Sequence, residues 1–109
     1  MSTYNGWKNY ETWAVNLWID NEEGTQTLWA ENTADVWRAA RMYPSGGFTV
    51  SETARLNLTA ALKDWAEESA PDLGASVWAD LLNAALGEVD WTELADSMLS
   101  TISNYEALA

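Results

Sequence analysis

The pattern of polar and apolar positions at the start of the chain predicts a helix that begins near residue 10. Asn9 is a typical helix N-cap, and Glu11 places an acid in the first turn, where the helix dipole favours negative charge. The predicted helix carries its apolar face at Trp13, Ala14, Leu17 and Trp18. The polar run 20–24 closes with a glycine and ends this helix.

Two longer helices are expected next. The first covers about residues 25–42, and its apolar stripe is formed by Trp29, Thr33, Val36, Trp37 and Ala40. After a break at Pro44, Thr49 and Glu52 match a capping box, in which the Thr side chain caps the helix and the Glu side chain bonds back to the cap. The helix that follows has the clearest helical spacing, at Ala54, Leu58, Ala61, Leu62 and Trp65.

The C-terminal third predicts two more helices after a break at Pro71. Residues 75–86 are apolar on nearly every side, which is typical of a buried helix, so we expect this helix at the centre of the fold. Asp90 caps the last helix, whose apolar face is predicted at Trp91, Leu94, Ala95, Met98, Ile102 and Tyr105. The prediction is an all-α protein with one helical domain over residues 1–109, a compact single-core bundle of about five helices.

Composition narrows the classes of function. Seventeen acidic residues against five basic ones give a net charge of −12, which disfavours direct binding to nucleic acid or to an anionic membrane. The chain has no His and no Cys, so the commonest general base, the commonest transition-metal ligand and any thiolate site are missing. The first residues lack the basic and apolar regions of a signal peptide. We therefore expect a cytoplasmic protein with no membrane contact, cofactor or metal.

The acidic residues are unevenly distributed along the chain. All five basic residues lie in the first 63 positions, whereas ten acids and no base occur from Asp64 onwards. The net charge matches, to an order of magnitude, that of about 20 Å of duplex DNA. The sequence therefore predicts an acidic, partner-binding surface at Asp64, Glu67, Glu68, Asp72, Asp80, Glu88, Asp90, Glu93 and Asp96. Acidity that serves solubility alone is the alternative.

Eight Trp residues divide into two groups. Those in phase with the apolar stripes are expected in the core: Trp13, Trp37, Trp65, Trp78 and Trp91. Trp7, Trp18 and Trp29 are candidates for exposed anchors, since Trp is enriched where binding energy is concentrated at protein interfaces. For Trp7, packing back onto the first helix from before its cap is the favoured interpretation.

Catalysis would have to depend on paired carboxylates. The candidate pairs are Glu22 with Glu23, Glu67 with Glu68, and Glu93 with Asp96. Such pairs need a concave, partly dry site, and these fall in polar turns or on outer helix faces, so solvated surface acids explain them better. The run 20–24 lacks the ligand spacing of a calcium-binding loop. We therefore expect no enzyme activity.

Two segments carry a resemblance to known proteins. The stretch 6–24, which contains Asn9-Tyr10-Glu11-Thr12-Trp13, resembles the "NYETW" signature of small uncharacterised proteins found in phages, plasmids, bacteria and haloarchaea. The stretch 79–95 is similar to the C-terminal part of the same proteins. The resemblance implies no activity, substrate or catalytic residue. Its mobile-element context is one in which small acidic proteins often inhibit host defence, and many of these inhibitors imitate DNA.

Charge and resemblance together suggest a non-enzymatic inhibitor of a host nucleic-acid-binding defence complex, of the anti-CRISPR or anti-restriction type. Its carboxylates would stand in for phosphates in the partner's basic channel, and the site of action would be the host cytoplasm. The alternative is a small structural or regulatory interaction module, a homodimer included, with no imitation of nucleic acid.

Overall fold

A computed structural model describes residues 3–43 and 46–102, which form five α-helices. The helices are α1 (Tyr10–Asn21), α2 (Glu23–Met42), α3 (Val50–Ser69), α4 (Val77–Glu88) and α5 (Trp91–Leu99). Within these residues the β structure is limited to an isolated bridge between Tyr4 and Trp7. The all-α prediction is confirmed, although α2 begins two residues earlier than expected and so includes Gly24.

The helix starts follow the local sequence closely. The Asn9 side chain accepts a hydrogen bond from the Thr12 backbone N–H at 2.9 Å, as expected for the N-cap of α1. Both hydrogen bonds of the capping box between Thr49 and Glu52 are formed. The Asp90 side chain caps α5 by accepting from the Glu93 N–H. These caps satisfy N–H groups that have no partner inside their own helix.

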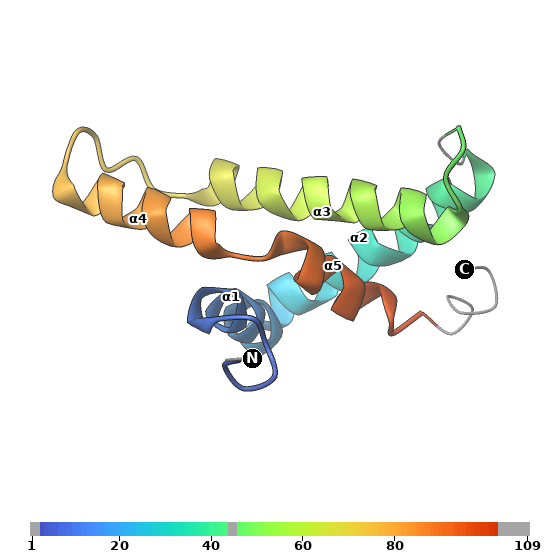
Figure 1. Cartoon of the computed structure of the whole chain (residues 1–109), viewed down its shortest axis with the longest axis horizontal. Coiled ribbons are helices and arrows are strands. Elements are labelled where there is room, and N and C mark those ends of the chain that lie inside the picture. Colours follow the sequence, from blue (N-terminus) through green and yellow to red (C-terminus); the bar gives the residue numbers. More distant parts are fainter. Residues whose placement is uncertain (1–2, 44–45, 103–109) are drawn as a thin grey trace.

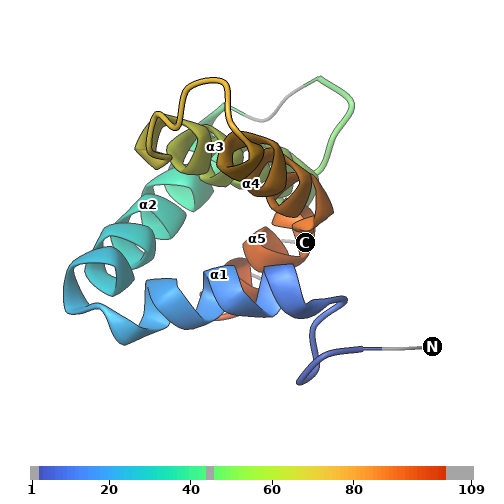
Figure 2. The ribbon, with the colours of Figure 1, turned by 90° about the vertical axis from the view of Figure 1, so that its left-hand side faces the viewer.

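The core lies between α2, α3 and α5. Figure 1 shows α5 below α3, and Figure 2 shows that α2 runs up to α3 from below, so both helices pack on that side of α3. The predicted stripes of α2 and α3 are confirmed, and so is that of α5 up to Met98, because their central residues are buried and the others pack against them. Ile102 packs against the core beyond the end of α5, and Tyr105 lies outside the described residues. The fully buried leucines are Leu58, Leu62, Leu94 and Leu99. Burial of such side chains is the main term that holds a bundle of this size together.

The buried face of α1 differs from the prediction. Its buried residues are Thr12 and Ile19, and Val15 lies between them against the core. The predicted face is turned partly outward, so that Trp18 is exposed. The helix is oriented with Thr12 toward the core. This polar side chain is tolerated there because its hydroxyl donates one hydrogen bond to Asn9 and accepts another from the Asp90 N–H.

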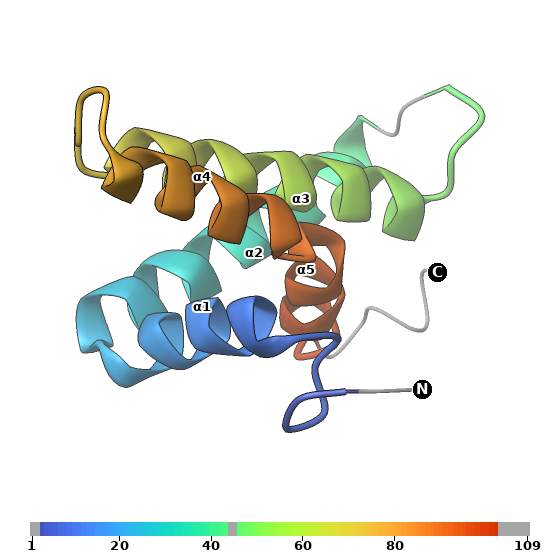
Figure 3. The ribbon, with the colours of Figure 1, turned by 60° about the vertical axis from the view of Figure 1, so that its left-hand side comes forward.

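Helix α4 is not at the centre, and this expectation was wrong. It lies alongside the C-terminal half of α3 at one end of the molecule (Figures 1 and 3), and none of its residues is buried. The centre is already filled by the apolar faces of α3 and α5, so α4 is covered on one side only. Several of its large apolar side chains therefore face solvent: Val77, Trp78 and Leu81.

The Trp residues follow the same correction. Trp37 and Trp91 are buried as predicted, and Trp65 is partly buried against the core. Trp29, placed on the apolar stripe of its helix and also considered as an exposed anchor, is buried at 3% exposure and contacts Trp65 edge to face. Trp78, predicted in the core, is exposed because its helix is peripheral. Phase within a stripe thus shows which side of a helix is apolar, and the packing decides whether that side is covered.

The start of α1 is joined to the link between α4 and α5. Asn9 donates its side-chain N–H to the Glu88 carbonyl at 2.7 Å, and Thr12 accepts from the Asp90 N–H at 2.9 Å. The Lys8 N–H adds a third hydrogen bond, to the Glu93 carboxylate at 3.0 Å. Three polar contacts therefore fix where α4 ends relative to α1.

Candidate protein-binding surface

Four of the nine predicted partner-binding acids also have a bonding role within the fold. Asp90 caps α5, and Glu93 accepts from the Lys8 backbone. Asp96 forms an ion pair with Arg55 at 2.9 Å, and Asp72 accepts from the backbone N–H two residues ahead. The acids of α5 thus help to hold the helix start and the N-terminal segment in place.

The other five acids make no ion pair or side-chain hydrogen bond within the described part of the chain. They are exposed and lie on two neighbouring helices: Asp64, Glu67 and Glu68 on α3, and Asp80 and Glu88 on α4. The i, i+3, i+4 spacing of the α3 set places its members on one face. Lys63 is the one basic residue between Arg55 and the end of the sequence. We call these five exposed carboxylates on α3 and α4 the acidic surface, and they are a subset of the nine predicted acids.

An apolar groove lies beside these acids, between α1, the C-terminal end of α3 and α4. Its volume is about 290 Å³. Its larger side chains come from four helices: Trp18, Trp65, Leu82, Leu86 and Trp91. We call this feature the α1–α3–α4 groove. Its lining is apolar apart from Ser69.

Large apolar side chains are exposed on α1 and α4. Trp18, which lines the groove, is 67% exposed, whereas Trp78 and Leu81 of α4, at 66% and 56%, are exposed outside its lining. Trp78, Leu81 and Leu82 are spaced i, i+3, i+4, so they share one face of α4. Single exposed apolar residues are ordinary, whereas an exposed Trp beside an apolar groove makes this region a candidate binding surface.

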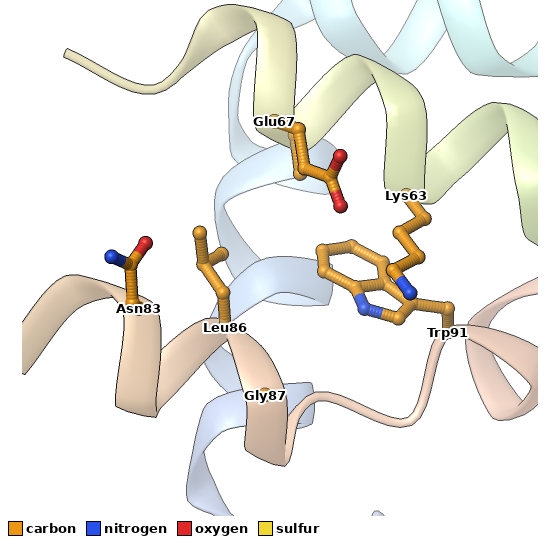
Figure 4. Close-up of a pocket in the computed structure, with 7 residues that line it drawn as sticks. Lys63, Glu67, Asn83, Leu86, Gly87 and Trp91 are labelled. Atoms are coloured by element: carbon orange, nitrogen blue, oxygen red, sulfur yellow. The ribbon is translucent and has the colours of Figure 1, made fainter. Parts of the chain in front are cut away.

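A second hollow lies along the same seam between α3 and α4. Figure 4 shows Lys63 and Glu67 extending from α3 toward the indole of Trp91, with Leu86 and Asn83 on α4 across from them. This hollow has a volume of about 260 Å³ and shares Leu86 and Trp91 with the α1–α3–α4 groove. Because both sides of Leu86 are hollow, α4 is packed incompletely against the rest of the fold.

Sequence reasoning missed the groove because it interpreted an apolar helix as a central one. The sequence of α4 did offer an indication. A 12-residue helix that is apolar on nearly every side and follows a loop with Pro and Gly can also lie at the edge of a fold, with part of its apolar surface exposed. Trp18 was correctly considered as an exposed residue.

The carboxylate pairs do not assemble a deep site. Glu93 and Asp96 line a shallow depression with Lys8 and Arg55, and each is engaged by one of these two residues. Glu67 and Glu68 are exposed on α3. No group of three or more acids within residues 3–43 and 46–102 is arranged to hold a metal ion. Across the same residues, no helix combines the length and apolar character needed to cross a bilayer.

Comparison with protein families places the chain in an uncharacterised group. A family model described as a family of unknown function, DUF7249, matches residues 1–105. The chain belongs to the DUF7249 family. No curated protein and no solved structure matches it. The expected membership of an uncharacterised family is therefore confirmed, and DUF7249 brings no activity with it.

The structure explains what the signature residues do in this DUF7249 member. Asn9 and Thr12 come from the first segment that carries the resemblance, and Glu88, Asp90 and Glu93 come from the second. The hydrogen bonds between them join the two segments directly. These signature residues thus form an architectural joint between the two segments.

Proposed function

We propose that this DUF7249 protein is a non-enzymatic inhibitor that binds the basic nucleic-acid channel of another protein, with its carboxylates in place of phosphates. The partner class is a host defence complex, as in anti-CRISPR or anti-restriction proteins, and the site of action is the host cytoplasm. The partner is therefore a basic protein, and the inhibitor itself binds no nucleic acid.

One observation carries this proposal. Five exposed carboxylates on α3 and α4 form no ion pair within the described residues, and Lys63 is the one base among them in a chain with a net charge of −12. Asp64 and Glu68 lie one helical turn apart, an arrangement that destabilises a helix by roughly 0.2–0.5 kcal/mol. Acids that weaken their own helix fit a binding role better than a structural one. The field of such a surface speeds the approach of a basic partner.

A pair of charge-matched variants tests the proposal. One variant neutralises four acids of the acidic surface: Asp64→Asn, Glu67→Gln, Glu68→Gln and Asp80→Asn. The control neutralises four acids elsewhere: Asp20→Asn, Glu22→Gln, Glu23→Gln and Glu31→Gln. Both variants have the same net charge, so they differ in where the charge has been removed. Binding to purified restriction and CRISPR effector complexes is measured by calorimetry at several salt concentrations.

The proposal expects the first variant to bind at least about tenfold more weakly than the control. Wild-type affinity should fall steeply as salt rises, and duplex DNA should compete for the same site on the partner. Equal affinities for the two variants, or binding that is flat across the salt range, would contradict the proposal. A tight homodimer that occupies the acidic surface would instead favour an interaction module without nucleic-acid mimicry.

A further inference from the structure

The second hollow, between α3 and α4, gathers polar groups of both charges around an apolar floor. We call it the α3–α4 hollow. Its polar lining is Lys63, Glu67 and Asn83, and its apolar lining includes Ala66, Leu86 and Trp91. The volume of about 260 Å³ lies just below the range of about 300–1,000 Å³ that is typical of drug-sized ligands. The hollow therefore suits a molecule smaller than most cofactors.

Lys63 and Glu67 bring opposite charges to this hollow without pairing with each other. They lie four residues apart on α3, a spacing at which opposite charges are neighbours and commonly pair. Within the described residues, neither side chain takes part in an ion pair. Figure 4 shows both side chains extending from α3 toward the indole of Trp91. An ammonium and a carboxylate are thus both available to a ligand at this place.

The indole N–H of Trp91 is a third group available to a ligand. Trp91 is only 8% exposed, and its N–H has no hydrogen-bond partner in the part of the chain that the structure describes. Unlike the N–H of Trp29, it is not sealed from solvent. In the view of Figure 4 the indole nitrogen lies on the side of the ring nearer Lys63. Because the core holds the ring in place, this donor is pre-organised for an acceptor on a ligand.

We propose that the α3–α4 hollow binds a free α-amino acid with an apolar side chain. The carboxylate of the ligand accepts hydrogen bonds from the Lys63 ammonium and the Trp91 N–H. Its ammonium group donates to the Glu67 carboxylate and to the side-chain oxygen of Asn83, which faces α3 from α4. Its apolar side chain covers Leu86 and the ring of Trp91. Hydrogen bonds between charged groups are the stronger ones, and a few of them suffice to orient a small ligand.

The charges of the hollow favour a ligand that carries both signs. A ligand with a carboxylate alone meets repulsion from Glu67, in a chain whose net charge is −12. A ligand with an amine alone meets repulsion from Lys63. An amino acid matches both groups and has no net charge of its own. The inference goes beyond the proposed function, since it requires no partner protein and holds whether or not the acidic surface imitates nucleic acid.

Three ligands with the same branched apolar side chain supply the probes. L-Leucine carries both charged groups, isocaproate lacks the amine, and isoamylamine lacks the carboxylate. Each is titrated into the isotope-labelled full chain at neutral pH, and the indole N–H signal of Trp91 is followed by NMR. The melting temperature is measured alongside, because a ligand that binds the folded state alone raises it.

Two matched pairs of variants locate the site. Lys63→Met removes the ammonium and keeps an apolar stem, and its control is Lys8→Met, at the other Lys of the chain and outside the hollow. Glu67→Gln removes the carboxylate charge, and its control is Glu68→Gln, at an exposed neighbour that does not line the hollow. Each pair leaves the same net charge. All four residues are exposed, so the variants should keep the helical content of the wild type, which circular dichroism checks.

The proposal expects L-leucine to shift the Trp91 signal saturably, with a Kd of about 1 mM or below, and to raise the melting temperature. Lys63→Met and Glu67→Gln should each weaken binding at least about tenfold, and the two controls should change it less than about twofold. Isocaproate and isoamylamine should bind at least about tenfold more weakly than L-leucine.

Three results would overturn the proposal. The first is the absence of a saturable shift of the Trp91 signal at millimolar L-leucine. The second is an analogue that binds as tightly as L-leucine, since the hollow would then recognise a single charge or the apolar side chain. The third is an equal effect of the two variants within either pair. No partner protein enters these measurements, so failure here is separate from failure of the proposed function.

Discussion

The buried hydroxyl of Thr12 accepts a hydrogen bond of 2.9 Å from the backbone N–H of Asp90, 78 residues further along the chain. The same hydroxyl donates to the Asn9 side chain at 2.6 Å. One Thr side chain thus connects the N-cap of α1 to the N-cap of α5. The contact fixes where α4 ends, and with it the edge of the α1–α3–α4 groove.

Loss of the Thr12 hydroxyl should destabilise the fold strongly. Thr12→Val keeps the shape of the side chain but leaves the Asp90 N–H without its acceptor, at a cost of about 1–3 kcal/mol. Thr59→Val is the control, because the Thr59 hydroxyl bonds only to a carbonyl in its own helix. Urea unfolding should show a change below about 0.5 kcal/mol for the control. Equal stability losses would mean that the joint contributes nothing specific.

Two Trp residues of opposite burial should respond differently to the same substitution. Trp29→Ala removes a buried side chain and its contact with Trp65, and should cost about 3–5 kcal/mol. Trp18→Ala should change the free energy of unfolding by no more than about 0.5 kcal/mol, because Trp18 is exposed. Thermal unfolding of the two variants provides the measurement. A large loss for Trp18→Ala would show that Trp18 is covered in solution.

The capping box of α3 should be visible in the titration of Glu52. The hydrogen bond from the Thr49 backbone N–H, followed by that with the Thr49 side chain, lowers the pKa of Glu52 below its ordinary value of 4.5. A lowered folded-state pKa means that this contribution to stability is present above pH 4.5 and is lost as the pH falls through the folded-state pKa. NMR titration of the carboxyl carbon should therefore give a midpoint below 4.5.

The matching substitution is at the cap residue. Thr49→Ala removes the side-chain partner, and so should move the pKa of Glu52 back toward the ordinary value and destabilise α3 by about 1 kcal/mol. Thr27→Ala, in the exposed part of α2 and away from any cap, should leave the Glu52 titration unchanged. The backbone N–H of residue 49, the larger cause of the lowered pKa, remains in Thr49→Ala, so the return is expected to be partial. Unchanged stability in Thr49→Ala would show that the side-chain cap is not formed in solution.

Neutralising one acid of the α3 surface should stabilise the protein slightly. Glu68 lies four residues after Asp64, so Glu68→Gln relieves a like-charge contact and should raise stability by roughly 0.2–0.5 kcal/mol. Glu67 lies four residues after Lys63, which attracts it, and three residues after Asp64, which repels it. The two effects oppose each other, so Glu67→Gln should leave stability nearly unchanged. Denaturant unfolding at low salt compares the two. A loss of stability in Glu68→Gln would indicate that this acid has a structural role.

Much of the fold was predictable because local contacts control it. The N-caps at Asn9, Thr49 and Asp90 depend on side chains within three residues of each helix start. The stripes of α2, α3 and α5 depend on the 3.6-residue period alone, and burial followed them. The position of α4 was not predictable in this way, since an apolar helix does not specify how many neighbours will cover it.

The candidate site was predictable only in part, for a related reason. The sequence showed ten acids and no base from Asp64 onwards, but it could not show that Asp96 meets Arg55 across 41 positions or that Glu93 meets the Lys8 backbone across 85. The apolar groove depends on the approach of α1, α3 and α4, which no local pattern encodes.

The sequence by itself determined the five helices, the starts of α1, α3 and α5, the apolar stripes of α2, α3 and α5, and that the chain is strongly acidic. These properties follow from neighbouring residues and from composition. The tertiary structure decided that α3 and α5 occupy the centre, that Trp29 is covered while Trp18 and Trp78 are not, and which acids are left without a partner. The physical reason is that burial and pairing depend on which distant segments meet, and the apolar faces of α2, α3 and α5 cover one another at the centre, which leaves α4 at the edge.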